Sequence, residues 1–360
     1  MNNDLTQDLQ DRVRAAAAAA TPLVLMGQGT KSFMGRATAG EPLELAGHAG
    51  ILNYEPQELV ITARAGTTLN EIETALAARG QMLPFEPPHF APPDGPDATL
   101  GGAIACGLSG PARPYAGAAR DLVLGARVLT GRAEVLRFGG EVMKNVAGYD
   151  VSRLMVGAYG TLGILLDVSL KVLPIPSVTR TLVQDCSMAE ALTRMTRWAG
   201  QPLPVTATLW DGAQLWVRLA GAGQGVTEAA ARIGGDPVDD DLAALFWREQ
   251  VREQRHDFFA GETPLWRLSL PSSAPPLDLP GSQWIEWGGA QRWLRSELDA
   301  ATIRARVEAV GGQATLFRGG DRTGAVFHPL PPALLQLHRQ LKQAFDPQCI
   351  LNPGRLYAAF

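Results

Sequence analysis

The chain has 360 residues and a formal net charge of −4, with 32 lysines and arginines against 36 aspartates and glutamates. This length suits two domains better than one core, and a slightly acidic balance excludes a protein built to coat nucleic acid. Three scattered cysteines and the lack of an apolar stretch of about 18 residues exclude a disulfide scaffold, a cysteine-ligated metal centre and a membrane span. A reduced, cytoplasmic compartment fits this composition best.

The first 176 residues predict a mixture of helices and strands. An amphipathic helix is expected at the N-terminus, and a second helix is expected to begin at Thr68, because Thr68 and Glu71 have capping-box spacing. Apolar residues then recur on one helical face until Gly80. The strands of this unit are predicted over residues 23–26, 58–65, 122–130, 133–138 and 164–173.

Composition changes after Pro176. All eight tryptophans lie between Trp198 and Trp293, whereas 22 of the 39 glycines precede Pro176. Because proline cannot continue a central strand, the cluster that ends at Pro176 predicts a domain boundary. The later strands are predicted over 203–209 and 215–219, and the helices over 188–198, 290–310 and 332–345. We therefore divide the chain into residues 1–176, 177–330 and 331–360.

A glycine-rich loop, residues 27–32, follows the first strand. The dinucleotide-binding fingerprint of doubly wound folds does not fit it, because Ser32 takes the third glycine position and no helix pattern follows. Small residues here let several backbone N–H groups point at one anion, and Thr30 and Lys31 add donors. The loop predicts a phosphate cradle, with a plain strand-to-loop turn as the alternative.

Three further segments combine glycine with small and polar residues, over 97–110, 144–150 and 160–164. The glycines of the first segment would be costly inside a helix. They are better explained if a flat ring and a pyrophosphate approach the backbone closely. Several such segments in one order are a more specific signal than any one of them.

In this order, the segments resemble the FAD-binding domain of the vanillyl-alcohol oxidase flavoproteins, the PCMH-type family. The resemblance is carried by Gly27 to Lys31, Thr99 to Gly102, Tyr115 to Asp121, Gly148 to Asp150, Gly160 to Gly163 and the closing motif Phe345 to Arg355. Within the family, residues 83–89, 105–111 and 143–150 are most similar to the smaller FAD-binding subunits of bacterial glycolate oxidases.

The resemblance implies an α+β fold, with a two-part PCMH-type FAD-binding domain, a smaller α+β cap domain (antiparallel sheet plus helices) and a C-terminal return to the FAD domain. It also implies a set of FAD contacts around the pyrophosphate, the isoalloxazine edge and the adenosine. These contacts are Gly27, Gln28, Gly29, Thr30, Lys31, Ser32, Thr99, Gly101, Gly102, Ser109, Gly110, Gly117, Asp121, Asn145, Gly160, Gly163, Ile164 and Asn352. The first loop has no histidine that could tether the flavin, and His48 is interpreted as structural, so non-covalent FAD is expected.

The second unit departs from the larger catalytic relatives, which carry clustered cap histidines that often hold a metal. Here His256 and His328 have no ligand spacing, so no metal site is expected. No general base is evident. His328 is a candidate base with a structural role as its alternative, and Arg318 with Arg322 is a candidate carboxylate clamp.

Three functions remain open. The favoured one is an FAD-binding subunit of a complex that oxidises glycolate, a 2-hydroxy acid, to glyoxylate. It would work beside a larger FAD-binding subunit and an iron–sulfur subunit, in the cytoplasm or peripheral to the inner membrane through these partners. The short cap and the missing histidine cluster favour it. The alternatives are a stand-alone FAD-dependent 2-hydroxy-acid dehydrogenase and a non-catalytic assembly subunit with the same fold.

Overall fold

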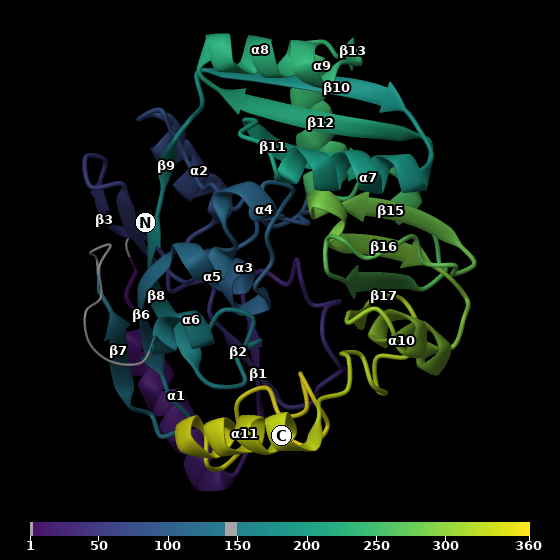
Figure 1. Cartoon of the computed structure of the whole chain (residues 1–360). Coiled ribbons are helices and arrows are strands. Elements are labelled where there is room, and N and C mark those ends of the chain that lie inside the picture. The colour runs from purple at the N-terminus through teal and green to yellow at the C-terminus, as the bar shows by residue number, and fades with distance from the viewer. Residues whose placement is uncertain (1–2, 141–149) are drawn as a thin grey trace.

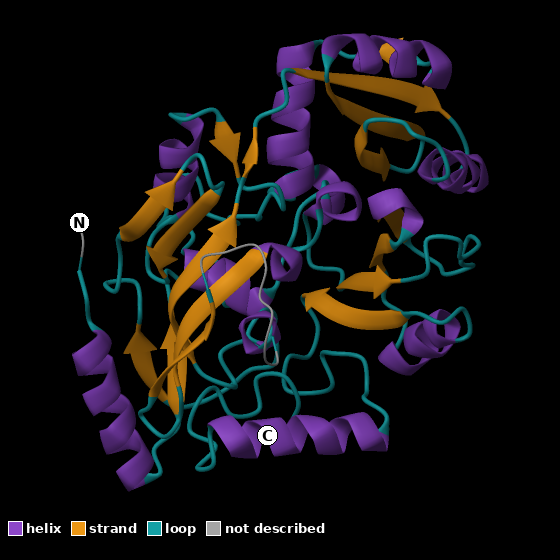
Figure 2. Ribbon diagram, turned by 60° about the vertical axis from the view of Figure 1, so that its left-hand side comes forward, coloured by secondary structure: helices purple, strands orange, loops and turns teal. Residues whose placement is uncertain are grey.

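The computed structural model describes residues 3–140 and 150–360. Within these residues, the chain folds around two larger sheets, one of five strands and one of eight. Figure 1 shows the five-stranded sheet on the left, the eight-stranded sheet on the upper right and α11 (Pro332–Phe345) below both. Figure 2 shows the strands gathered in two separate groups. The expected α+β fold is confirmed.

The five-stranded sheet is antiparallel throughout. Its strands, in spatial order, are β3 (Ile51–Glu55), β4 (Val60–Arg64), β8 (Ile164–Lys171), β6 (Val123–Leu129) and β7 (Val135–Gly139). Two small sheets accompany it, formed by β1 (Leu23–Met26) with β2 (Glu41–Glu44) and by β5 (Gln81–Met82) with β9 (Leu173–Pro174). The predicted hairpin of β6 and β7 is confirmed.

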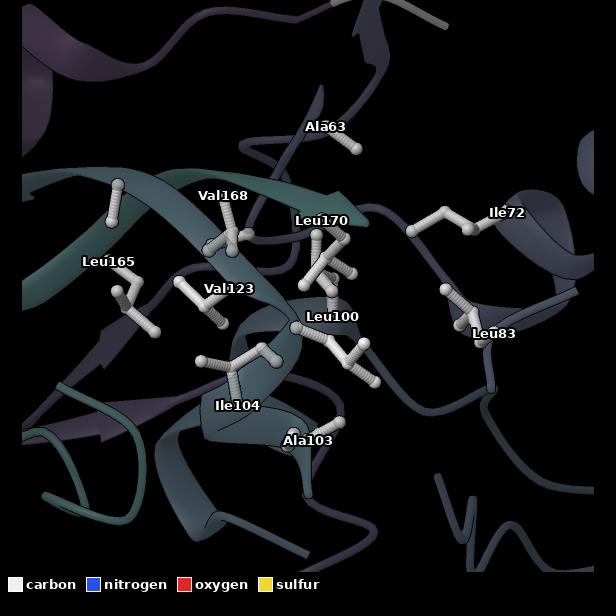
Figure 3. Packing of buried hydrophobic residues seen from close by; sticks show 14 of the residues in the cluster. Ala63, Ile72, Leu83, Leu100, Ala103, Ile104, Val123, Leu165, Val168 and Leu170 are labelled. Atoms are coloured by element: carbon white, nitrogen blue, oxygen red, sulfur yellow. The ribbon is translucent and has the colours of Figure 1, made fainter. Parts of the chain in front are cut away.

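Two helices cover one face of this sheet. They are α2 (Leu69–Ala77) and α3 (Leu100–Cys106). In Figure 3, Leu100 and Ile104 of α3 lie against Val168 of β8 and Val123 of β6. The start of α2 is as predicted, because the Thr68 hydroxyl accepts a hydrogen bond from the Glu71 N–H at 3.1 Å. On the other side, α1 (Thr6–Ala19) packs in a separate apolar cluster.

The glycines of α3 have a different role from the one predicted. Residues 100–106 are helical, although Gly101 was expected to disfavour a helix. A Cβ atom on Gly101 would lie 2.7 Å from the Cβ of Ala65, at the end of β4. The missing side chain therefore lets the helix pack closely on the sheet, and the cost of a helical glycine is offset by that packing.

The eight-stranded sheet belongs to the cap and is also antiparallel. Its order is β13 (Asp236–Pro237), β10 (Val178–Asp185), β12 (Gln214–Gly221), β11 (Val205–Trp210), β15 (Ser282–Glu286), β16 (Gln291–Arg295), β14 (Leu265–Ser269) and β17 (Gln313–Arg318). The cap helices are α7 (Met188–Ala199), α8 (Gly223–Ile233), α9 (Asp240–Leu245) and α10 (Ala300–Glu308). The remaining helical segments are α4 (Arg113–Ala116), α5 (Ala119–Leu122), α6 (Val151–Leu154), η1 (Phe246–Arg252), η2 (Asp257–Phe259) and η3 (Trp287–Gly289).

The helix predicted over 290–310 is wrong in its first part. Residues 291–295 form β16, an interior strand of the cap sheet, and the helix begins only at Ala300. Asp299 caps that helix by accepting a hydrogen bond from the Thr302 N–H at 2.9 Å. Residues 291–294 are buried on both faces of the sheet. A strand of this kind shows no alternation, so its pattern cannot be told from that of a buried helix.

The C-terminal tail returns to the first strand. The Leu23 N–H donates to the Ile350 carbonyl at 2.7 Å, and the Asn352 N–H donates to the Leu23 carbonyl at 2.9 Å. The final helix, α11, has the predicted limits. Between Pro174 and Val178, the chain passes from the strands of the first part to the eight-stranded sheet. The division into three units, with boundaries at 176 and 330, stays a prediction. None of the described helices is both long and apolar enough to cross a bilayer.

Candidate functional site

One cavity gathers most of the predicted cofactor contacts. It lies between β1, α3 and the C-terminal tail, and it encloses about 1160 Å³ with open solvent included. We call it the flavin cavity. The predicted residues that line it are Gly27, Gln28, Gly29, Thr30, Lys31, Ser32, Thr99, Gly101, Gly102, Gly160, Gly163, Ile164 and Asn352.

The first loop presents unused donors to this cavity. In the part of the chain that the structure describes, the backbone N–H groups of Gln28, Gly29, Thr30 and Lys31 donate to no protein acceptor. Ser32 N–H closes the turn by donating to the Gly29 carbonyl at 3.0 Å. Consecutive N–H groups that lack partners form a concave anion-binding surface. The loop therefore has the donor set that a pyrophosphate requires.

Gly29 makes this turn possible. Its φ is +77°, and a Cβ atom added there would have nothing within 4 Å. The conformation is therefore available to glycine and strained for a side chain, while the space beyond the backbone is open. A ligand can approach the chain directly at this position.

Lys31 adds a buried cation to the loop. The side chain is 7% exposed, and its Nζ donates to the His89 carbonyl at 2.9 Å and to the Thr30 hydroxyl at 3.3 Å. Burial lowers the pKa of Lys31 to about 8, although Cys106 and Glu253 act in the opposite direction. A bound anion would favour the charged form of Lys31. Lysine and anion would thus stabilise each other.

Asn352 lines the cavity but acts on the chain. Its side-chain carbonyl accepts a hydrogen bond from the Leu25 N–H at 2.9 Å, and its amide donates to the Tyr159 carbonyl at 2.7 Å. Asn352 thereby holds β1 beside the turn at Tyr159, and both segments line the cavity. Its predicted contact with the flavin stays a prediction.

Several predicted contacts do not reach this cavity. The Ser109 hydroxyl accepts from the Ala119 N–H at 3.0 Å, and Asp121 accepts from the Ala118 N–H at 2.9 Å. Gly110 packs on the Glu86 carbonyl, and Gly117 has a φ of +95° beside Asp121. These residues, Ser109, Gly110, Gly117 and Asp121, fix the loop between α3 and β6 and do not line the flavin cavity. Asn145 lies outside the described residues.

Three residues of the wall with polar or ionisable side chains were not predicted from the sequence. Cys106, Tyr159 and Arg355 all line the cavity. Burial raises the pKa of Cys106 to about 11 and also raises the pKa of Tyr159, so both groups are neutral at neutral pH. Arg355 donates to the Ser32 carbonyl at 3.0 Å and holds the first loop in place. Arg355 belongs to the closing motif already singled out, whereas Tyr159 and Cys106 carried no separate signal.

The candidate catalytic residues have other partners. His328 accepts a hydrogen bond from the Ala314 N–H at Nδ1 and contacts Glu308 at 2.9 Å through Nε2, so both ring nitrogens are engaged within the cap. Arg318 lies over the rings of Phe33, Phe90 and Phe317, and burial lowers its pKa to about 10. This is the arrangement of a structural histidine and of a cation packed between aromatic rings.

Arg322 does not form the predicted clamp with Arg318. Its guanidinium donates to the carbonyls of Leu316, Phe33 and Gly35 at 2.7 to 2.8 Å. These bonds tie the cap to the segment after the first loop. His48, interpreted as structural, is 1% exposed and accepts from the Leu5 N–H at 3.0 Å. Among residues 3–140 and 150–360, no three His, Cys, Asp or Glu side chains gather as metal ligands.

The cavity fits FAD in its chemistry. The unused N–H groups at one side suit a pyrophosphate, and the open space beyond Gly29 admits a ligand against the backbone. Apolar side chains, among them Leu25, Ala105 and Met155, suit a flat aromatic ring. The residues present therefore match a ligand with an anionic middle and planar ends.

Two family models match the chain. The FAD binding domain matches residues 4–139, which contain most of the flavin cavity, and the C-terminal domain of FAD linked oxidases matches residues 324–356. The first match confirms FAD as the cofactor, and the second covers most of the tail that returns to β1. The chain is thus that of an FAD-dependent oxidoreductase.

Comparison with individual proteins indicates which kind of FAD-dependent oxidoreductase the chain resembles. The chain is 49% identical over 355 residues to glycolate oxidase subunit GlcE of Escherichia coli (strain K12), covering 99% of this chain and 98% of that protein. It is also 32% identical over 164 residues to glycolate oxidase subunit GlcD of Bacillus subtilis (strain 168), covering 45% of this chain and 34% of that protein. A solved structure of alkyldihydroxyacetonephosphate synthase shares the fold, with a TM-score of 0.66 at 16% identity over 97% of this chain and 76% of that one.

Proposed function

Because this chain belongs to the family of glycolate oxidase subunit GlcE within the FAD-linked oxidases, we propose that it is the FAD-binding subunit of a complex that oxidises glycolate to glyoxylate. The observation that carries the proposal is the flavin cavity, whose first loop offers consecutive N–H groups without protein acceptors. Identity over nearly the full length of both chains supports glycolate as the substrate.

Different residues of the cavity would hold different parts of the cofactor. The first loop would hold the pyrophosphate through its backbone N–H groups, with Lys31 as the counter-charge. Cys106 and Tyr159 line the side of the cavity that continues toward the cap. FAD itself would accept the two electrons of the substrate's carbon–hydrogen bond. We also propose that it is bound non-covalently, because residues 27–32 contain no histidine.

The complex would need further subunits. Oxidation of glycolate to glyoxylate releases two electrons and two protons, which must leave the flavin before a second turnover. A larger FAD-binding subunit is supported by the similarity to a second glycolate oxidase subunit, and an iron–sulfur subunit would take the electrons. The assembly would lie in the cytoplasm, peripheral to the inner membrane through its partners.

The two alternatives are less well supported by this chain. A stand-alone 2-hydroxy-acid dehydrogenase needs a positioned base, and both ring nitrogens of His328 already have partners. A purely structural assembly subunit has no need of a loop with unused N–H donors, which water or an anion must satisfy. Both alternatives predict different activities from the favoured function.

We expect the isolated chain to oxidise glycolate slowly or not at all with an artificial electron acceptor, and turnover to appear when the partner subunits are added. The physical reason is the missing base, since a positioned base contributes typically about 10²–10⁴-fold to such a rate. The measurement is acceptor reduction by the isolated chain and by the reconstituted complex at equal FAD content. Steady turnover by the isolated chain, abolished in His328→Ala with FAD still bound, would establish the stand-alone dehydrogenase instead.

A further inference from the structure

A second cavity adjoins the flavin cavity on the side of the cap. It encloses about 690 Å³ with open solvent included, and it shares Cys106 and Tyr159 with the flavin cavity. We call it the arginine chamber, after Arg113, Arg120 and Arg267 in its wall. Arg113 comes from α4 of the FAD-binding part and Arg267 from β14 of the cap. The chamber therefore lies between the two parts of the molecule, beside the cofactor site.

The charged residues in the described wall of this chamber are all cationic. No aspartate or glutamate is among the described residues of its wall. Arg267 donates through Nε to the Gln291 side chain at 2.7 Å, and within residues 3–140 and 150–360 it forms no ion pair. Glu286 acts on Arg267 only at longer range, because its carboxylate accepts the indole N–H groups of Trp284 and Trp293. Arg267 is thus a half-buried cation that forms no direct ion pair among the described residues.

Arg113 is in the same position. Within the described chain its guanidinium has no hydrogen bond or ion pair, and Asp121 influences it only electrostatically. The guanidinium groups of Arg113 and Arg267 lie 4.4 and 5.1 Å from the centre of the Trp287 ring. Trp287 is itself fixed, because its indole N–H donates to the Gly110 carbonyl at 3.0 Å. One indole therefore holds two cations from different parts of the chain close together.

Two neighbouring cations that are half-buried repel each other more strongly than two cations in water. Burial and the charge of Arg113 lower the pKa of Arg267 to about 10, so both groups still carry their charge at neutral pH. Buried charges are ordinarily paired, because the loss of hydration is otherwise uncompensated. A guanidinium binds a carboxylate through two parallel hydrogen bonds. An anion in the chamber would remove both the repulsion and the unpaired charge.

We propose that the arginine chamber binds the carboxylate of a small 2-hydroxy acid, held by Arg113 and Arg267 beside the flavin. The inference rests on the proposed function for the position of the flavin, and it adds a substrate-binding surface to this subunit. Tyr159, which lines both cavities and has a neutral hydroxyl, and Thr315 supply uncharged partners for the acid's hydroxyl group. No histidine or carboxylate of the described wall could take its proton. The chamber binds the acid without supplying a base.

The test is calorimetric titration of the FAD-loaded chain with glycolate, and with ethylene glycol, which has an uncharged hydroxymethyl group in place of the carboxylate. We expect one glycolate site and no ethylene glycol binding. Arg267→Met and Arg113→Met are each expected to weaken glycolate binding at least tenfold with FAD content unchanged. Arg267→Lys is expected to bind glycolate with an affinity between those of the parent and Arg267→Met, because it keeps the charge and loses the bidentate geometry. Arg306→Met, at an exposed position on α10, is the matched control and should bind as the parent does.

FAD content, read from the flavin absorption of each variant, separates the two proposals. If the parent binds FAD but no glycolate, or if both arginine variants bind glycolate as the parent does, the arginine chamber is not a carboxylate site and the proposed function stands. If the parent binds no FAD, the proposed function fails. Because Arg113→Met leaves the cap sheet intact, it decides the matter should Arg267→Met not fold.

Discussion

Gly29→Val is expected to empty the flavin cavity of FAD and leave the chain folded. A side chain at φ +77° is strained, at a cost of roughly 1–2 kcal/mol for an ordinary residue and more for a β-branched one. The loop would relieve this strain by turning its N–H groups away from the pyrophosphate. Losing two bonds to a charged group, at about 1.5–3 kcal/mol each, weakens FAD binding on the order of 100-fold or more. Titration of the flavin-free chain with FAD measures the change.

Gly234→Val is the matched control for this variant. Gly234 has a φ of +72° and, like Gly29, has nothing within 4 Å of an added Cβ atom. It lies in the cap at the end of α8, away from the flavin cavity. The control should therefore also strain the backbone at a positive φ, and it should keep the parent's affinity for FAD. Equal affinity in Gly29→Val and the parent would mean that residues 27–32 do not hold the pyrophosphate.

Lys342→Met is expected to destabilise the fold by about 3–5 kcal/mol, the usual cost of removing one member of a buried ion pair and leaving the other unpaired. Lys342 is 1% exposed and Asp346 is fully buried, and their charged atoms are 2.7 Å apart. The Lys342 Nζ also donates to the carbonyls of Thr161 and Leu351 at 2.8 and 2.7 Å. Without it, the Asp346 carboxylate loses its counter-charge and the two carbonyls lose this donor. Urea unfolding followed by circular dichroism measures the loss.

Arg339→Met provides the comparison, because Arg339 is an exposed charge on the same helix and its loss should change stability by less than about 0.5 kcal/mol. Lys342→Met/Asp346→Asn should be less unstable than the single variant, since it removes the uncompensated charge. If Lys342→Met lost under 1 kcal/mol, roughly the value of a surface pair, the tail would not depend on this ion pair.

Local rules of the sequence predicted much of the fold. The limits of α11, the capped start of α2 and the hairpin of β6 and β7 all follow from patterns within a few residues. β16 could not be predicted in this way, because it is buried on both faces and its pattern lacks a period of two. Likewise, the helical state of Gly101 depends on the close approach of Ala65, from a strand distant in sequence.

The candidate site likewise has a part that the sequence could predict and a part that it could not. The first loop was predictable because its glycines and donors are consecutive in sequence and act through the backbone. Its four unused N–H groups now give that prediction a physical basis. Arg113 and Arg267 were not predictable, since the chain has 28 arginines and nothing local marks these two. Only the packing of both on Trp287 distinguishes them.

The state of the bound flavin can be measured directly. The purified chain is expected to be yellow, with the absorption of an oxidised flavin. Precipitation with acid is expected to release FAD into the supernatant, because the first loop has no histidine and the buried Cys106 thiol is neutral. Flavin that stayed with the precipitate would contradict non-covalent binding and point to Cys106 as the attachment site. A colourless chain that took up no FAD on titration would contradict the assignment of the flavin cavity itself.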